Sequence, residues 1–230
     1  MKITITYPES WAEIKYSQYL KYHKAVKPYE GTDDYNRVSI ESAALHFCKV
    51  PAELLYQLPE DVFNKISDHL KVLFNSASDI VLSNQFTVGD TTYGFIPALD
   101  EMSYGEYLDL VSYSEKNVWD NIPLVFSILY RPVKLSVGKQ YTIIPYAGTD
   151  NARVELFKHV LTMDVVFGAM AFFLGLQKDL LTGTLAYSME ILKNQTDPET
   201  LAALETLQKS GADITQLQSL LTMTLQNLTK

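Results

Sequence analysis

The chain has 230 residues, a formal net charge of −8 and 47% hydrophobic residues, a balance that excludes global disorder. Ten Gly and nine Pro exclude collagen-like and linker-like sequences. The single cysteine, Cys48, excludes an intrachain disulfide framework and a zinc site built from cysteines.

The N-terminal part predicts a short strand followed by helices. Residues 2–7 alternate with β-branched side chains, which is typical of a strand. Ser10 and Glu13 have the spacing of a capping box, so a helix is expected over 11–25. Further helices are expected in this part at 39–49, 51–55 and 59–74, the last of them clearly amphipathic.

In the middle of the chain the hydrophobic period changes to two. Residues 85–97 alternate around Gly89–Asp90, which predicts a β-hairpin with a tight turn. Ser103 and Glu106 form a second capping box that opens a helix. Another helix is expected over 118–130, ending before Pro132, and a second strand region over 141–145.

The last third predicts helices. One long apolar helix is expected over 154–175 with a kink at Gly168, and further helices are expected at 177–193, 198–210 and 214–228. Together the elements predict an α+β fold that is mainly α-helical, with a short N-terminal strand and a small β-hairpin. The changes in pattern predict a strand plus helical block, a hairpin followed by a helical core, and a C-terminal helical hairpin, at residues 1–84, 85–193 and 194–230.

The charge distribution limits the class of partner. Residues 51–120 contain three basic and twelve acidic side chains, and no basic stripe is present to neutralise phosphates. We therefore expect no nucleic-acid binding. The longest uncharged apolar stretch, residues 165–177, is too short to span a bilayer, and the N-terminus lacks a signal peptide, so a cytoplasmic location without a membrane contact is expected.

No residue pattern points to a cofactor, a metal or a catalytic nucleophile. The four histidines, at positions 23, 46, 69 and 159, have no His or Cys at metal-ligand spacing. Glycine-rich phosphate loops and a nucleophile elbow are also absent from the sequence. Cys48 follows an apolar helical segment and is expected to be a packed thiol. We therefore expect no catalytic, cofactor-binding or metal-binding residue, and a protein that is not an enzyme.

The densest carboxylate cluster consists of Asp100, Glu101, Glu106 and Asp109. Such a cluster could serve acid–base or metal chemistry, which leaves an enzyme of unrecognised type as an alternative. The other interpretation is structural, because acids near a helix N-terminus meet the positive end of its dipole. Arg131 is the single basic residue of an apolar neighbourhood, and we expect it to form a structural ion pair with Glu106 or Asp109.

Aromatic side chains are abundant near the N-terminus. Six of the fifteen tyrosines lie in the first 35 residues, and Tyr16, Tyr19 and Tyr22 are spaced by three along one expected helix. Tyr has an apolar body and a polar tip, which suits an interface, although core packing explains such residues equally well. The predicted interface residues are Trp11, Tyr16, Tyr19, Tyr22, Phe86 and Tyr93.

Several segments resemble proteins of tailed bacteriophages. P-E-S-W-A-E-I-K-Y-S-Q-Y at 8–19 and the run at 40–74 that begins I-E-S-A-A-L-H-F-C-K-V-P-A-E-L-L are similar to tail assembly chaperones, which place a small helical block after an N-terminal strand. D-E-M-S-Y-G-E-Y-L-D-L at 100–110, I-L-Y-R-P-V at 128–133 and Y-T-I-I-P-Y-A-G-T resemble segments of uncharacterised phage proteins encoded among structural genes.

The resemblance implies a non-enzymatic role in virion morphogenesis, by contact with other phage structural proteins. Members of the chaperone family bind the tape measure protein and help the tail tube to polymerise. This chain departs from the family in its length and in its apolar C-terminal helices. The alternative is therefore a structural subunit retained in the virion as a connector, tail or cargo component, for which a homo-oligomer is one of the expected assemblies. The resemblance implies the host cytoplasm or the virion as its location.

Overall fold

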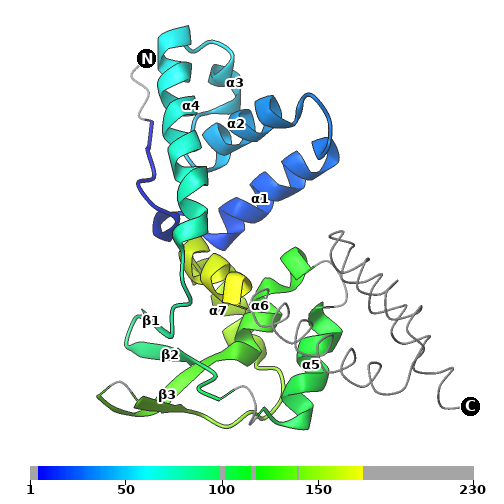
Figure 1. The fold of residues 1–230 in the computed structure, drawn as a ribbon, viewed down its shortest axis with the longest axis vertical. Coiled ribbons are helices and arrows are strands. Elements are labelled where there is room, and N and C mark those ends of the chain that lie inside the picture. Colours follow the sequence, from blue (N-terminus) through cyan, green and yellow to red (C-terminus); the bar gives the residue numbers. More distant parts are fainter. Residues whose placement is uncertain (1–4, 99–101, 115–117, 139, 173–230) are drawn as a thin grey trace, which may run out of the picture. The chain divides into compact units, whose positions relative to one another are not determined.

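The computed structural model describes residues 5–98, 102–114, 118–138 and 140–172 (Figure 1). The chain divides into two compact units, Met1–Ala171 and Phe172–Lys230, and the described residues belong almost entirely to the first. Residue 85, the expected start of a second domain, lies inside this first unit. The helices expected at 177–193, 198–210 and 214–228 lie outside the described residues, as does the predicted C-terminal domain.

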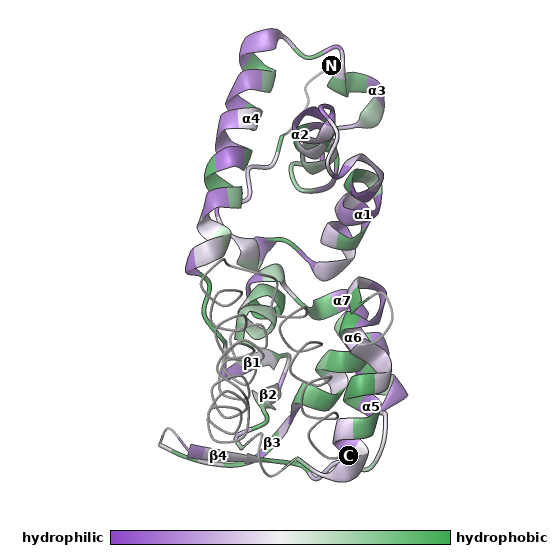
Figure 2. Cartoon of the chain, turned by 45° about the vertical axis from the view of Figure 1, so that its right-hand side comes forward, coloured by the Kyte–Doolittle hydropathy of each residue, from purple (hydrophilic) through white to green (hydrophobic). Residues whose placement is uncertain are grey.

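The first part of this unit is a block of helices. Its elements are η1 (Trp11–Glu13), α1 (Tyr16–Val26), η2 (Lys27–Tyr29), α2 (Tyr35–His46), α3 (Ala52–Leu55), α4 (Glu60–Asn75) and η3 (Ser76–Asp79). The prediction of an amphipathic helix over 59–74 is confirmed by α4, which buries Ile66, Leu70 and Leu73. Figure 2 shows hydrophobic and hydrophilic residues alternating along α4, whereas α6 (Val118–Leu129) is hydrophobic over most of its length.

The expected N-terminal strand is not formed in the residues that can be described. Residues 5–9 have no regular secondary structure, and residues 1–4 lie outside the described ranges. One backbone hydrogen bond, from Thr6 N–H to Cys48 O at 3.1 Å, attaches this segment to the turn after α2. Alternating β-branched residues are not enough for a strand where no neighbouring strand offers a ladder of partners.

Two expected helices are interrupted where they meet each other. Lys15 and Thr162 form an isolated antiparallel bridge, in which Tyr16 N–H donates to Leu161 O and Met163 N–H donates to Ile14 O, both at 2.9 Å. The helix expected over 11–25 is therefore split into η1 and α1. The helix expected over 154–175 is likewise split into α7 (Asn151–Val160) and a helix that runs from 163 to the end of the described residues at 172.

The second part is built around a four-stranded antiparallel sheet. Its strands are β1 (Gln85–Val88), β2 (Thr91–Phe95), β3 (Tyr130–Val137) and β4 (Gln140–Ile143), in the order β1-β2-β3-β4. The β1–β2 pairing confirms the predicted hairpin, and β4 corresponds to the strand expected near 141–145. The small hairpin of the prediction is thus one half of a larger sheet.

The strand β3 was not expected from the sequence. It follows α6 directly, and its outer pairing with β4 contains an irregularity between Val133 and Leu135. Pro132 cannot donate a backbone hydrogen bond, but its carbonyl accepts one from Ile144 N–H at 3.0 Å. A proline and a lysine within a short run hide the alternation that identifies a strand.

Three helices, α5 (Tyr104–Ser114), α6 and α7, accompany the sheet in this second part. The capping box predicted for α5 is confirmed, because Ser103 N–H donates to Glu106 Oε2 at 2.7 Å and Glu106 N–H donates to Ser103 Oγ at 3.3 Å. The protein is therefore α+β and mainly helical. Among the helices that can be described, none combines the length and the apolar character needed to cross a bilayer.

Gly168 allows two segments to approach closely. The chain is helical on both sides of it, and a Cβ atom at this position would lie 2.3 Å from Val81 O. We predict that Gly168→Ala destabilises the protein by about 1–3 kcal/mol, because the backbone at Val81 must move. Urea unfolding measures the loss.

The matched control is Gly105→Ala. Gly105 is also helical, but a Cβ atom there would lie 3.9 Å from Tyr146 Cε1, an ordinary van der Waals contact. This variant should be neutral or more stable by up to about 1 kcal/mol, because alanine has the higher helix propensity. Equal stability of the two variants would contradict the close approach at Gly168.

Candidate functional site

Most of the aromatic side chains predicted as an interface lie in the core. Trp11, Tyr16 and Tyr22 are 4%, 3% and 8% exposed. Trp11 Nε1–H donates to Leu73 O at 2.9 Å, and the Tyr22 hydroxyl lies 2.7 Å from Ser39 Oγ. A buried Tyr or Trp is favourable when its polar tip finds a partner, and here each tip has one. Trp11 therefore joins η1 to α4, Tyr22 joins α1 to α2, and Tyr16 joins α1 to α6 through the carbonyl of Trp119.

The remaining predicted interface residues also take part in aromatic packing. Tyr93 is 7% exposed, and Tyr19 and Phe86 are half-buried. Phe86 stacks on Tyr93 with ring centroids 5.5 Å apart and packs against Tyr130 and Phe157. Tyr19 packs between Phe47 of the helical block and Trp119 of α6, and burial raises its pKa well above its ordinary value. Trp11, Tyr16, Tyr22 and Tyr93 therefore serve the core, and only Tyr19 and Phe86 keep part of their surface exposed.

Glu106 and Arg131 form a buried ion pair. Glu106 Oε1 lies 2.6 Å from Arg131 Nη2, and the two side chains are 6% and 7% exposed. Burial lowers the pKa of Arg131, and the nearby Glu106 carboxylate opposes that shift. Because the pair joins α5 to β3, it fixes the helix against the sheet. Glu106 is thus both a capping residue and the partner of Arg131.

Asp109 has a different partner. Its carboxylate accepts a hydrogen bond from the Tyr146 hydroxyl, and the Arg131 guanidinium lies 5.8 Å from the centre of the Tyr146 ring. Tyr146 is therefore shared between the acid and the arginine. Asp100 and Glu101, the other members of the predicted carboxylate cluster, lie outside the described residues.

A second buried arginine was not singled out from the sequence. Arg153 of α7 donates from Nε to Ser127 O at 3.0 Å, and its Nη1 lies 3.5 Å from Asp150 Oδ2. Burial lowers its pKa. The sequence signal for this arginine is its spacing of three residues from Asp150. Asp150 also caps α7, because its carboxylate accepts hydrogen bonds from the amides of Ala152 and Arg153.

The structure offers little for metal or thiol chemistry. Within the described ranges, no three His, Cys, Asp or Glu side chains converge closely enough to hold a metal ion. His69 Nε2 lies 2.8 Å from Pro8 O, and His159 pairs with Glu155 at the surface. Cys48 is fully buried, and burial raises its pKa to about 11, which keeps the thiol protonated and unreactive.

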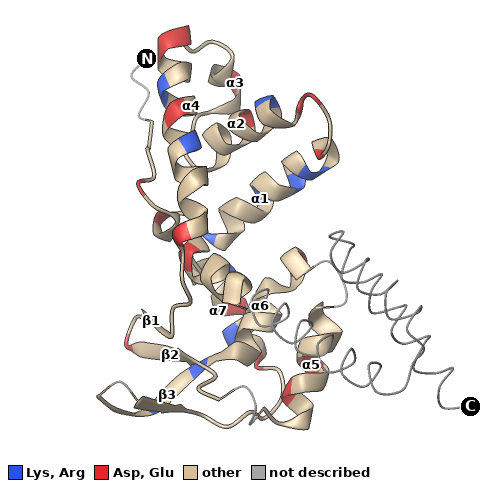
Figure 3. Ribbon diagram, viewed as in Figure 1, with Lys and Arg blue, Asp and Glu red and all other residues tan. Residues whose placement is uncertain are grey.

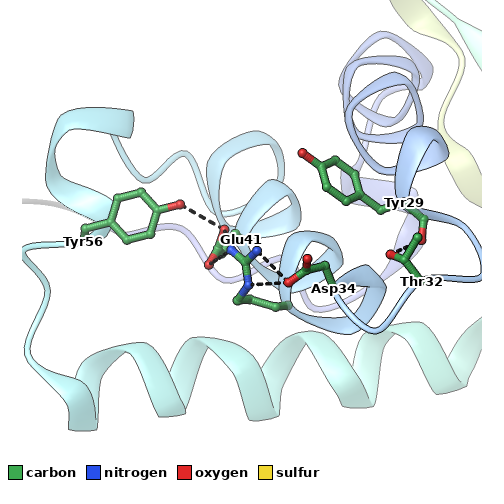
Figure 4. A network of polar contacts seen from close by, with 6 residues as sticks. Tyr29, Thr32, Asp34, Glu41 and Tyr56 are labelled. Carbon is green, nitrogen blue, oxygen red and sulfur yellow. Dashed lines mark hydrogen bonds and ion pairs between the residues drawn. The ribbon is translucent and has the colours of Figure 1, made fainter.

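An exposed network of polar contacts joins the end of α3 to α2. Tyr56 is 78% exposed, and its hydroxyl donates to Glu41 Oε2 at 3.0 Å. Arg37 connects the same glutamate to the loop before α2, with Nη1 3.2 Å from Glu41 Oε1 and Nη2 2.9 Å from Asp34 Oδ1. Figure 4 shows Tyr29 and Tyr56 on opposite sides of Glu41 in this view. We call these five residues the Tyr56 surface.

This network contributes little to the stability of the fold. The side chains of Arg37 and Asp34 are 56% and 59% exposed. Exposed ion pairs contribute about 0–1 kcal/mol, because water screens them and both side chains lose freedom. Its contact with the Tyr56 ring is the bond from the hydroxyl to Glu41, which leaves most of the ring exposed. Figure 3 shows acidic residues in the neighbouring loop between α1 and α2 and along α4.

The chain matches no protein-family model, and neither the curated proteins nor the solved structures contain a significant match to it.

We predict that Glu106→Gln destabilises the protein by about 3–5 kcal/mol, because it leaves the Arg131 charge buried without a counter-charge. Glutamine keeps the acceptor of the capping box, so the loss reports the ion pair. Chemical denaturation followed by circular dichroism measures it. Asp109→Asn serves as the control and should cost about 1 kcal/mol, since Asp109 bonds to Tyr146 instead. A loss in Glu106→Gln no larger than the control would contradict this role of the pair.

Stability should fall on acidification through two histidines. Burial lowers the pKa of His23 and of His46 below the ordinary value, and nearby lysines act in the same direction. Their neutral forms therefore stabilise the fold above about pH 6.5, and this contribution is lost as the pH falls through the lower folded-state values. Each histidine adds at most about 1.4 kcal/mol per pH unit in that window.

Unfolding free energies between about pH 7.5 and pH 5 test this dependence. A double variant with His23→Gln and His46→Gln should show a shallower fall than the parent protein. Parallel curves for the two proteins would contradict the contribution of these histidines.

Proposed function

We propose that this protein acts by contact with other proteins during the assembly of a bacteriophage virion, in the manner of a tail assembly chaperone. It works in the host cytoplasm, or in the virion if it is retained there. The resemblance of segments 8–19 and 40–74 to tail assembly chaperones supports the setting. The structural observation that supports the contact is the Tyr56 surface.

The Tyr56 surface has the chemistry of a protein-binding site. Tyr and Arg are enriched at interfaces and among the residues that dominate binding energy. The bond from Tyr56 to Glu41, and the contact of Glu41 with Arg37, restrict the tyrosine before any partner arrives. Such restriction reduces the side-chain entropy that is lost on binding. The acidic groups of the surface favour a partner that presents basic side chains.

The test uses co-expression of the tagged chain with the tape measure protein and the tail tube protein of the same virus. We expect at least one of them to co-purify with it. A double variant with Arg37→Ala and Tyr56→Ala should weaken that binding about 10- to 30-fold, because it removes an aromatic anchor and the network that holds it. Isothermal titration calorimetry with the purified pair measures the change.

The matched control is Tyr104→Ala. Tyr104 is 76% exposed, similar to Tyr56, but it lies on α5, and its loss should leave the affinity unchanged. Failure of both phage proteins to co-purify, or equal effects of the two variants, would contradict the proposal. The abundance of the protein in purified particles then separates a chaperone, which is absent from them, from a retained structural subunit.

A further inference from the structure

The strand β1 is an edge of the sheet. Among the described strands only β2 pairs with it, with Val88 opposite Thr91 and Phe86 opposite Tyr93. Gly89 is the first residue of the two-residue turn and has φ +57°. A tight hairpin turn of this kind needs a positive φ at its first residue, which glycine adopts readily. Because hydrogen-bonded pairs alternate along an antiparallel ladder, Phe86 and Val88 direct their peptide groups toward β2, and Thr87 directs its own outward.

A pocket lies beside this edge. It has a volume of about 250 Å³, and its walls come from β1, from the C-terminal end of α7 and from the Lys15–Thr162 bridge. Its apolar wall includes Phe86, Val88, Val160 and Val165. Pockets for drug-sized molecules usually measure about 300–1,000 Å³, so this one suits single side chains better than a small-molecule ligand.

Lys15 gives the pocket its charge. It is the one charged residue among those that line the pocket in the described part of the chain. Lys15 Nζ donates to Val160 O at 3.2 Å, which holds the ammonium group near the pocket although the side chain is exposed. An ammonium group has three donors, so two remain for another acceptor. Lys15 can therefore pair with a carboxylate placed beside the apolar wall of the pocket.

We propose that an extended segment of a partner protein adds to the outer edge of β1, inserts an aliphatic side chain into the pocket and places a carboxylate beside Lys15. Main-chain hydrogen bonds to Thr87 supply affinity, and the pocket and Lys15 supply selectivity, as in strand addition generally. The inference goes beyond the proposed function, because it concerns a different surface and states the chemistry of the bound segment.

The test uses the full chain and a fluorescein-labelled peptide, Thr-Val-Thr-Val-Thr-Glu-Thr, blocked at both ends. Its Val and Glu side chains share one face of a strand. We expect saturable binding by fluorescence anisotropy, together with slower hydrogen exchange of the Thr87 amide. The same peptide with Lys in place of Glu should bind about two- to fivefold more weakly, the range of one exposed ion pair.

Two variants separate the backbone and charge contributions. Thr87→Pro removes the outward N–H and should weaken binding about two- to tenfold, whereas Thr87→Ala keeps it and should bind normally. Lys15→Glu should reverse the preference between the Glu and Lys peptides. Lys21→Glu makes the same change in net charge on the exposed side of α1 and should not reverse it. Circular dichroism verifies folding, and Lys15→Glu remains informative if Thr87→Pro does not fold.

Several results would overturn the proposal. The first is the absence of saturable binding up to about 1 mM peptide. The second is equal binding of the Glu and Lys peptides. The third is binding that neither Thr87→Pro nor Lys15→Glu changes. Self-association of the unliganded protein that Thr87→Pro abolishes would instead assign the edge to a second copy of the chain. Because none of these variants touches the Tyr56 surface, binding through that surface is measured separately.

Discussion

The bridge between Lys15 and Thr162 is the contact on which the rest of the described unit depends. Its two backbone hydrogen bonds join residues that are about 145 positions apart and connect the helical block to the elements that cover the sheet. It separates η1 from α1 and α7 from the helix that begins at 163. Beside it, Trp11 packs against Phe167 with ring centroids 4.8 Å apart. The same bridge forms one wall of the pocket beside β1.

The core of this unit contains charge as well as aromatic rings. Arg131 and Arg153 are both buried, and their partners come from other elements or from the cap of α7. A buried ion pair adds little net stability compared with apolar packing, but a misplaced partner is costly. The Glu106–Arg131 pair therefore specifies which face of α5 meets the sheet, whereas Asp150 and Arg153 pair within the first turn of α7. Glu106 therefore joins α5 to β3.

The packing also decides which side chains are left to contact other molecules. The core buries Trp11, Tyr16 and Tyr22. Tyr56 lies outside the core, and its hydroxyl donates a hydrogen bond to Glu41. An aromatic side chain near the N-terminus is therefore no guide to an interface until its neighbours are known. The exposed network and the edge of β1 that no second described strand pairs with are the two features on which the proposed contacts depend.

The sequence by itself determined the local elements of this protein. Amphipathic spacing identified α4, alternation around Gly89 identified the first hairpin, and the spacing of Ser103 and Glu106 identified the cap of α5, because each depends on residues close together in the chain. Only the tertiary structure decided where helices break at Ile14–Lys15 and Leu161–Thr162, that β3 joins the sheet, and which tyrosines are buried. Those outcomes depend on contacts between residues far apart in the chain, and no local pattern records them.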